Sequence, residues 1–196
     1  MTATEYVVLV DGKDQEIGLA EKILAHEKNL LHRAFSVFVF RQKPTASLND
    51  TPLQRVELLL QQRAFHKYHS GGLWTNTCCS HPCANENIVK AGERRLREEL
   101  GISTSLKNLG WFHYMAYFPN GMFENEIDYV LVGMLPADDK VNPHPDEVHA
   151  YRWIGIAELE HEIVTDHTQF TPWLTTALEM VKAHLENPSL TDESAQ

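Results

Sequence analysis

Trp74-Thr-Asn-Thr-Cys-Cys-Ser-His-Pro82 and, shortly after it, Ala91-Gly-Glu-Arg-Arg-Leu-Arg-Glu-Glu-Leu-Gly-Ile102 are the two stretches around which this chain is organised. The first carries two thiols and an imidazole, and the second is a helical run that ends in two carboxylates. Arg95 lies four residues before Glu99, so its guanidinium can orient that carboxylate on one helix face. Gly101 is suited to the C-cap of this helix. A group able to act as an acid, base or nucleophile therefore precedes a carboxylate-bearing helix.

Cys79 and His81 are two residues apart, so on an extended chain their side chains point the same way. The pattern C-C-x-H-x-C, which runs from Cys78 to Cys83, could bind zinc. Structural zinc sites, however, usually use two separated pairs of ligands, and the chain has no second cysteine pair. Alternatively, Cys79 could be a small buried side chain, as free cysteines often are. The carboxylates downstream favour a third interpretation, in which Cys79 takes part in acid/base chemistry.

The helical run also resembles a known family signature. Its order R-x-L-x-E-E-L-G-I resembles the Nudix box, whose glutamates bind the divalent cation that handles a diphosphate. The box normally has Glu at the position of Arg95, and its opening glycine is displaced here, which argues against ordinary diphosphate hydrolysis. With N-T-C-C-S-H-P before the box and Glu124-Asn-Glu126 after it, the chain resembles the type I isopentenyl-diphosphate isomerases, Nudix-fold enzymes that do not hydrolyse their substrate. The resemblance extends from about Glu5 to Trp173.

Length and composition predict one soluble domain. The chain has 196 residues, 43% of them hydrophobic, which is enough for a core, and no apolar run approaches the roughly eighteen residues of a membrane span. The first residues lack the features of a signal peptide, and three cysteines form a poor disulfide framework, so we expect a cytoplasmic protein. The net charge of −10 argues against nucleic acid as a partner. We expect no membrane partner, a small-molecule diphosphate as substrate, and a monomer or homodimer.

The apolar patterning predicts an α/β (α+β) fold, a Nudix-like mixed β-sheet flanked by helices, in a single domain of residues 1–186. The polar residues 187–196 are expected to form a disordered tail. Strands are predicted at residues 5–10, around 17, and at 34–40, 54–61, 109–118, 123–132 and 148–154. The strands at 34–40 and 54–61 should form a hairpin. Besides the helix that carries Glu99, with Asn85 as its expected N-cap, helices should begin near Ile156 and near Phe170, with Pro172 near the first turn of the last.

Glu124 and Glu126 point to the same face of their predicted strand. Two neighbouring carboxylates repel unless a cation neutralises them or one holds a proton, so the pair indicates function rather than an exposed edge. Tyr114, on the preceding strand, could donate a hydrogen bond to a carboxylate or pack at the edge of the core. Trp173 falls on the apolar face of the last helix, so its periodicity predicts a core residue.

The resemblance assigns metal and substrate roles to residues whose types alone would be unremarkable. It implies that a divalent metal, Mn2+, Zn2+ or Mg2+, is bound by His26, His32, His81, Glu124 and Glu126. It implies a further Mg2+ at Glu99, bridging to the diphosphate. It makes Lys22, Arg63 and Lys67 contacts of the diphosphate, although each could equally be an ordinary surface cation. Trp173 would close over the hydrocarbon part of the substrate.

The implied reaction converts isopentenyl diphosphate to dimethylallyl diphosphate. Moving a double bond by one carbon requires adding one proton and removing another, through a tertiary cation-like state that must be shielded from water. Cys79 and Glu126 are the expected acid/base pair, with Tyr114 assisting near Glu126. The Trp173 ring could stabilise the positive charge by about 1–2 kcal/mol.

Two other functions stay open on the sequence. A Nudix hydrolase would release phosphate or a monophosphate and would be indifferent to loss of Cys79. A non-catalytic binding module would bind metal through the histidines and the acidic hairpin without turning over a diphosphate. Arg95 in the box and the pair of hairpin carboxylates argue against the hydrolase.

Overall fold

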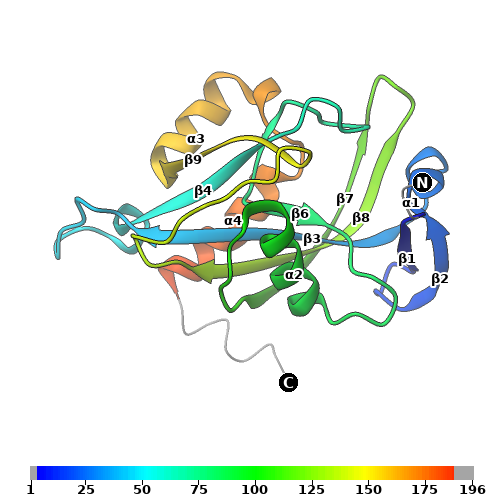
Figure 1. Ribbon diagram of the computed structural model, residues 1–196, viewed down its shortest axis with the longest axis horizontal. Helices are drawn as coiled ribbons and strands as arrows, with labels where there is room; N and C mark the ends of the chain where they lie inside the picture. Colours follow the sequence, from blue (N-terminus) through cyan, green and yellow to red (C-terminus); the bar gives the residue numbers. More distant parts are fainter. Residues whose placement is uncertain (1–3, 188–196) are drawn as a thin grey trace.

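The computed structural model describes residues 4–187, which are built around one mixed β-sheet with helices on both faces (Figure 1). This confirms the predicted fold class; residues 188–196 of the predicted tail lie outside the described part. None of the described helices is long and apolar enough to span a bilayer. The nine described strands and four α-helices are, in order, β1 (Tyr6–Val10), β2 (Glu16–Glu21), α1 (Lys22–Glu27), β3 (His32–Gln42), β4 (Val56–Arg63), β5 (Trp74–Thr75), β6 (Cys78–Ser80), α2 (Ile88–Leu100), β7 (Lys107–Tyr117), β8 (Phe123–Met134), β9 (Val148–Gly155), α3 (Ile156–Thr165) and α4 (Leu174–Glu186).

Strand β3 is the centre of the sheet. It runs parallel to β8, with His32 opposite Glu126, and antiparallel to β6, with Ser36 opposite Cys79. It also pairs with the start of β4, which confirms the predicted hairpin. Because both faces of β3 are covered, its middle is almost continuously apolar, as expected of a central strand. Strand β3 therefore places its own His32 beside Glu126 of β8, and it also pairs with β6, the strand that carries Cys79.

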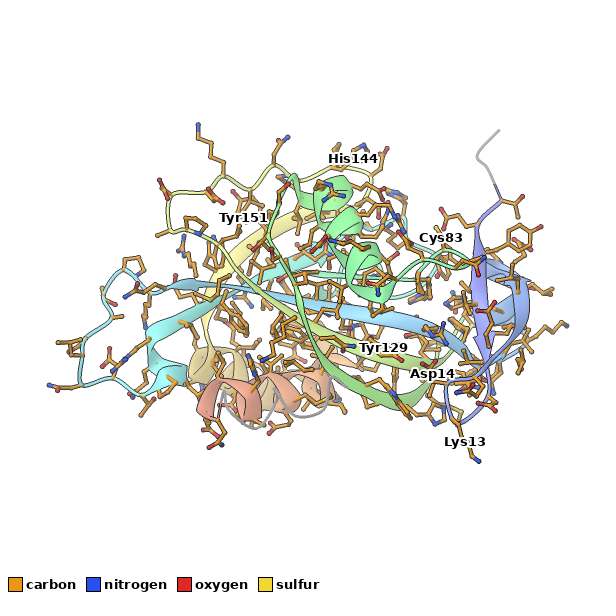
Figure 2. The ribbon with its side chains drawn as sticks, turned by 90° about the horizontal axis from the view of Figure 1, so that it is seen from below. Lys13, Asp14, Cys83, Tyr129, His144 and Tyr151 are labelled. Carbon is orange, nitrogen blue, oxygen red and sulfur yellow. The ribbon has the colours of Figure 1, made fainter. Side chains whose placement is uncertain are left out.

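The two faces of the sheet have separate cores. Alternate residues of β3 point to opposite faces, so Val37 packs with Leu96 of α2, whereas Phe38 packs with Leu174 of α4. Figure 2 shows α2 on one side of the sheet and α3 and α4 on the other. The sheet is thus held between helices, and the polar residues of its strands gather at one end instead of on a face.

Helix α2 is fixed at both ends and pressed onto the sheet. Its N-cap is Asn87, whose side chain accepts hydrogen bonds from two backbone N–H groups of the first turn. The prediction of Asn85 as N-cap is wrong, because Asn85 adopts a left-handed turn conformation (φ 61°) before the helix begins. Gly101 ends the helix in that conformation (φ 66°), as predicted. A Cβ at Gly92 would lie 2.7 Å from Leu131 Cδ1, so only glycine permits this approach.

The predicted strands are confirmed with small shifts at their ends. Strand β4 begins later than expected because Pro52–Arg55 form a short 3-10 turn. Helix α4 begins at Leu174, later than expected, and Pro172 lies just before its first turn, near the predicted position. The N-terminal hairpin β1–β2 is tied to the sheet through Asp14, which accepts a hydrogen bond from Arg33 Nε (2.8 Å) and another from the Tyr129 hydroxyl (Figure 2). This anchor places α1 beside β8.

Candidate active site

A pocket of about 500 Å³ opens where β3, β6 and β8 meet α1 and α2. Its walls bring together residues that lie far apart in the sequence: Lys22, Arg63, Lys67, Cys79, His81, Glu99, Tyr114, Glu124, Glu126 and Trp173. His26 and His32 are fully buried immediately behind the two hairpin glutamates. The folded chain therefore assembles all the residues that the sequence pattern singled out around one cavity.

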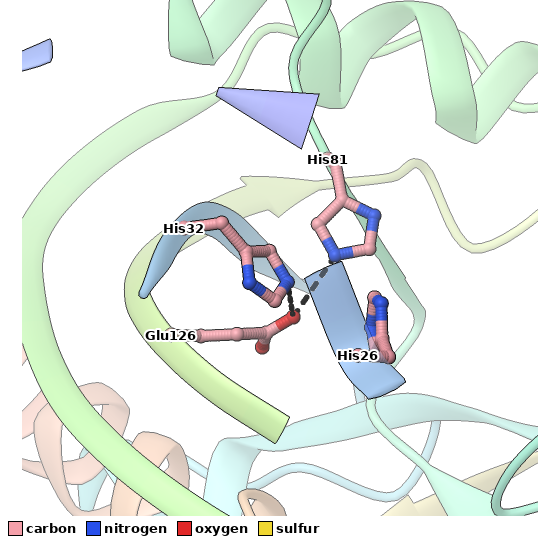
Figure 3. Close-up of side chains that lie close together, drawn as sticks. All are labelled: His26, His32, His81 and Glu126. Carbon is pink, nitrogen blue, oxygen red and sulfur yellow. Dashed lines mark hydrogen bonds and ion pairs between the residues drawn. The ribbon is translucent and has the colours of Figure 1, made fainter. Parts of the chain in front are cut away.

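The histidines and glutamates form a tight cluster (Figure 3). His32 Nε2 and His81 Nε2 lie 3.3 Å and 2.9 Å from the same atom, Glu126 Oε1. His26 Nε2 lies 3.4 Å from Glu124 Oε2. Potential ligand atoms of His26, His32, His81 and Glu126 all lie within 4.8 Å of one another, and so do those of His26, His69 and Glu124, so each group is close enough to bind one ion.

Backbone contacts fix which nitrogen of His26 and His32 faces the carboxylates. His26 Nδ1 donates to the Lys22 carbonyl (2.7 Å) and His32 Nδ1 donates to the Leu30 carbonyl (2.8 Å). A neutral imidazole has one N–H, so each Nε2 presents a lone pair to a carboxylate oxygen. His32 Nε2 and Glu124 Oε2 are buried without a hydrogen-bond partner. Opposed acceptors repel, so the geometry fits a cation between them.

A proton on His26 or His32 could also supply positive charge, and burial affects how readily each ring binds one. Burial lowers the pKa of His26, while the pKa of His32 is raised because its contacts with Glu126 outweigh burial. A proton on His26 is thus disfavoured. Imidazole nitrogens and carboxylate oxygens together suit a divalent transition metal or Mg2+, so a metal ion fits this donor set.

The two hairpin carboxylates differ in protonation. Burial and the neighbouring Glu126 raise the pKa of Glu124 to about 7. Burial also raises the pKa of Glu126, but its contacts with the imidazoles of His32 and His81 outweigh it and hold that pKa well below its ordinary value. Tyr114, on the neighbouring strand, donates its hydroxyl to Glu126 Oε2 at 2.5 Å. Glu126 is therefore the ionised member of the pair.

The Cys79 thiol is protonated, in contrast to the ionised Glu126. Burial raises the pKa of its thiol to about 12, although Arg63 acts against this shift. Arg63 Nη1 lies 3.1 Å from Cys79 Sγ and can donate to it. The site thus holds a protonated sulfur and an ionised carboxylate, with a cation positioned to stabilise a thiolate once the proton has left.

Another part of the pocket wall is rich in cations, and three of them have carboxylate partners. Lys22 pairs with Glu5 and Lys67 pairs with Glu147. On α2, Arg95 Nη2 lies 2.6 Å from Glu99 Oε1, the contact expected from their spacing. Among residues 4–187, the groups of three or more ligands close enough to bind a metal do not include Glu99. A Mg2+ there would depend on waters and substrate phosphates, as Mg2+ commonly does.

Comparison with known proteins places this pocket in a family. A NUDIX domain model matches residues 30–174. An isopentenyl-diphosphate Delta-isomerase of Aliivibrio fischeri (strain MJ11) is 46% identical over 186 residues, which cover 93% of this chain and 97% of that protein. One from Serratia proteamaculans is 40% identical over 180 residues, 92% of this chain and 93% of that protein. The chain belongs to the isopentenyl-diphosphate Delta-isomerase family.

Solved structures support the same fold at low identity. A Deinococcus radiodurans crystal structure superposes with a TM-score of 0.65 at 16% identity, covering 90% of this chain and 99% of that chain. An Ap4A hydrolase complex from Caenorhabditis elegans gives 0.54 at 18% identity, covering 78% and 96%. The Nudix fold of this isomerase family member is therefore shared with hydrolases, and its chemistry depends on the site residues.

Trp173 is a core residue, as its periodicity predicts, and it also lines the pocket. Its ring is buried at 3% exposure at the N-terminal end of α4 and also lines the pocket. Its Nε1 donates to Asn76 Oδ1 at 3.1 Å, and its centroid lies 6.0 Å from the Tyr114 ring. The indole is held rigidly with an aromatic surface toward the space that a substrate would occupy.

The cysteines do not form a zinc site. Cys78 is fully buried in the core beneath α2, whereas Cys83 is exposed in the segment that leads into α2 (Figure 2). Within the described part of the chain, no group that could hold a metal contains a cysteine. The alternation of β6 sends Cys78 into the core and Cys79 to the pocket.

Two polar residues of the site were missed in the sequence. Asp128 follows Glu126 at the spacing of one strand face, so alternation along β8 could have indicated it; it is buried and accepts a hydrogen bond from Ser36 Oγ at 2.8 Å. His69 lies between β4 and β5, where no periodic pattern marks it. Its Nε2 lies 2.8 Å from Glu124 Oε1.

Proposed function

We propose that this protein converts isopentenyl diphosphate to dimethylallyl diphosphate by adding and removing protons, assisted by a divalent metal. One observation carries the proposal: a protonated thiol, Cys79, and an ionised carboxylate, Glu126, line the same pocket. Two groups poised in opposite protonation states are what an allylic proton exchange needs. The names and the coverage of the relatives support the substrate.

In the proposed reaction Cys79 donates its proton to the terminal methylene carbon of the substrate. The alkene electrons form the new C–H bond, and the positive charge develops on the adjacent tertiary carbon. Glu126 then accepts a proton from the next carbon, and that C–H electron pair becomes the new double bond. Arg63 stabilises the thiolate that remains, and Trp173 shields the cation from water and faces it with its ring. Proton exchange with solvent, assisted by Tyr114, restores both groups.

A divalent ion, Mn2+, Zn2+ or Mg2+, would be held by His26, His32, His81, Glu124 and Glu126, where its charge would offset the two carboxylates. The Nδ1 hydrogen bonds of His26 and His32 to backbone carbonyls support this, because they turn both Nε2 lone pairs inward. A Mg2+ at Glu99 would bridge to the diphosphate. Lys22, Arg63 and Lys67 would complete its neutralisation. We place the protein in a reducing cytoplasm, in keeping with its free cysteines, as a monomer or homodimer.

The test follows isopentenyl diphosphate with Mg2+ in deuterated water by proton NMR, alongside a phosphate-release assay. Deuterium should enter the product without phosphate release. Cys79→Ala and Glu126→Gln should each lower the rate by about 100-fold or more, and Cys83→Ser, which changes an exposed thiol, should not. Near-normal activity in either variant would contradict the roles given to these residues. Phosphate release would indicate a hydrolase, and metal binding without turnover would indicate a binding module.

A further inference from the structure

His69 is a fourth imidazole beside the cluster, but its protons are arranged differently from those of His26 and His32. Its side chain is buried, and Nε2 lies 2.8 Å from Glu124 Oε1. When Glu124 is ionised its oxygens can only accept hydrogen bonds, so this short contact favours the tautomer of His69 with its proton on Nε2. Ser70 Oγ lies 3.3 Å from Nδ1, where its hydroxyl can donate to the free lone pair.

The ring of His69 is held in place from several sides. It stacks on His26 with centroids 5.5 Å apart and an interplanar angle of 22°, and on Phe118 at 5.1 Å and 24°. The Tyr68 ring meets it edge-on at 4.4 Å. A ring packed in this way delivers its N–H to one direction, which is toward Glu124.

The contact with His69 also determines the orientation of the other Glu124 oxygen, Oε2. With Oε1 bound to His69, Oε2 is turned toward His26 Nε2, 3.4 Å away, and is buried without a hydrogen-bond donor. Oε2 is thus the oxygen available to a cation. Partners that fix one oxygen of a ligating carboxylate orient the other and strengthen metal binding.

We propose that His69 is a positioning residue: its Nε2–H holds Glu124 so that Oε2 faces the divalent cation, while His69 itself stays outside the coordination sphere. This inference rests on the metal site of the proposed function. The loop between β4 and β5 would then contribute to metal affinity by orienting Glu124. His26 and His32 would contribute differently, as ligands that present lone pairs to the ion.

The test measures Mn2+ affinity of metal-free protein by calorimetry for wild type, His69→Ala and His69→Gln. We expect His69→Ala to weaken binding about 10- to 100-fold, the usual effect of removing such a partner. The Gln amide can donate to Oε1, so His69→Gln should recover most of the affinity. His66→Ala, which removes an exposed histidine of the same loop, should bind like wild type.

X-ray absorption of the Mn2+-loaded proteins then separates positioning from direct ligation. The number of imidazole ligands should be the same in wild type and His69→Ala; a loss of one would make His69 a ligand and overturn the proposal. Unchanged affinity in His69→Ala, or equal weakening in His69→Gln, would overturn it too. If His69→Ala fails to fold, Ser70→Ala replaces it, with a few-fold loss expected. Absence of Mn2+ binding by wild type would instead remove the metal site from the proposed function.

Discussion

The histidine–glutamate part of the pocket and the part lined by lysine and arginine, here called the histidine end and the cation end, differ in charge balance. At the histidine end, the lone pairs of His26 and His32 face the carboxylates of Glu124 and Glu126, and buried acceptors lack donors. At the cation end, Lys22, Lys67 and Arg95 already have carboxylate partners. The first end is incomplete without added positive charge. The second is complete until an anion competes for its cations.

This difference explains how a chain of net charge −10 can bind a diphosphate. Glu5 and Glu147 hold Lys22 and Lys67 at the pocket wall in the absence of substrate. A diphosphate can take over these contacts, since charge-assisted hydrogen bonds to phosphate are strong. The carboxylates thus keep the cations in place at little cost, because salt bridges at partly exposed positions are individually weak.

Removing a histidine from the histidine end should have the largest effect on metal affinity and activity. His32→Ala deletes an Nε2 lone pair that has no other role in the geometry. We expect Mn2+ affinity to fall by more than the about 100-fold typical of losing an outer partner, with isomerase activity falling in parallel. Calorimetry and the NMR assay measure the two effects. Lys28, nearby and exposed, offers a control as Lys28→Ala, and wild-type metal affinity in His32→Ala would contradict the incomplete histidine end.

A smaller effect should come from the cation end. Lys67→Ala should raise KM for isopentenyl diphosphate about 10- to 100-fold, since a hydrogen bond to a charged group contributes about 1.5–3 kcal/mol. Glu147→Gln frees Lys67 from its competing carboxylate and should leave KM unchanged or lower it. Steady-state kinetics with saturating Mg2+ measures both. An increase of KM in Glu147→Gln as large as in Lys67→Ala would show that the carboxylate belongs to the binding site rather than holding the lysine in reserve.

The smallest effect concerns the free energy of unfolding, whose pH dependence should differ between the histidine end and the cation end. Urea unfolding of metal-free protein measures it. Burial lowers the pKa of His81 to about 4 and of His69 to about 3, and it lowers that of His26. The unfolded chain therefore binds more protons below about pH 6.5, so stability falls as pH drops from there toward 4. Glu124 and Asp128, whose pKa values are raised, bind protons in the folded chain over this range and offset part of the fall, whereas His32, with a raised pKa, contributes only above pH 6.5.

The cation end should respond at lower pH. Burial raises the pKa of Glu147, but Lys67 and Arg95 outweigh it, so its contribution is lost only as pH falls below its ordinary value of 4.5. Each net proton gives a slope of at most about 1.4 kcal/mol per pH unit. Because Glu124 and Asp128 oppose the histidines, the net fall should be small, and stability that rises steadily as pH falls from 7 to about 5 would contradict the buried neutral histidines.

Local patterns in the sequence predicted much of the fold. Alternation and β-branched content identified β3 and β8, and the cap signal of Gly101 was correct, because these features depend on neighbours along the chain. The N-cap was misplaced by two residues, at Asn85 instead of Asn87. Both are asparagines with similar propensity, and the path of the chain before α2 decides between them.

For the site, the sequence by itself determined which residue types stand on which strand face. It put Glu124 beside Glu126 and Cys79 in phase with His81, because the strand period is a property of the backbone. The tertiary structure alone decided that β3 and β8 run parallel with His32 opposite Glu126, and that the loop carrying His69 folds back onto Glu124. Those contacts join segments far apart in the chain, and their charge balance depends on burial and on where each ring places its proton, which no local pattern encodes.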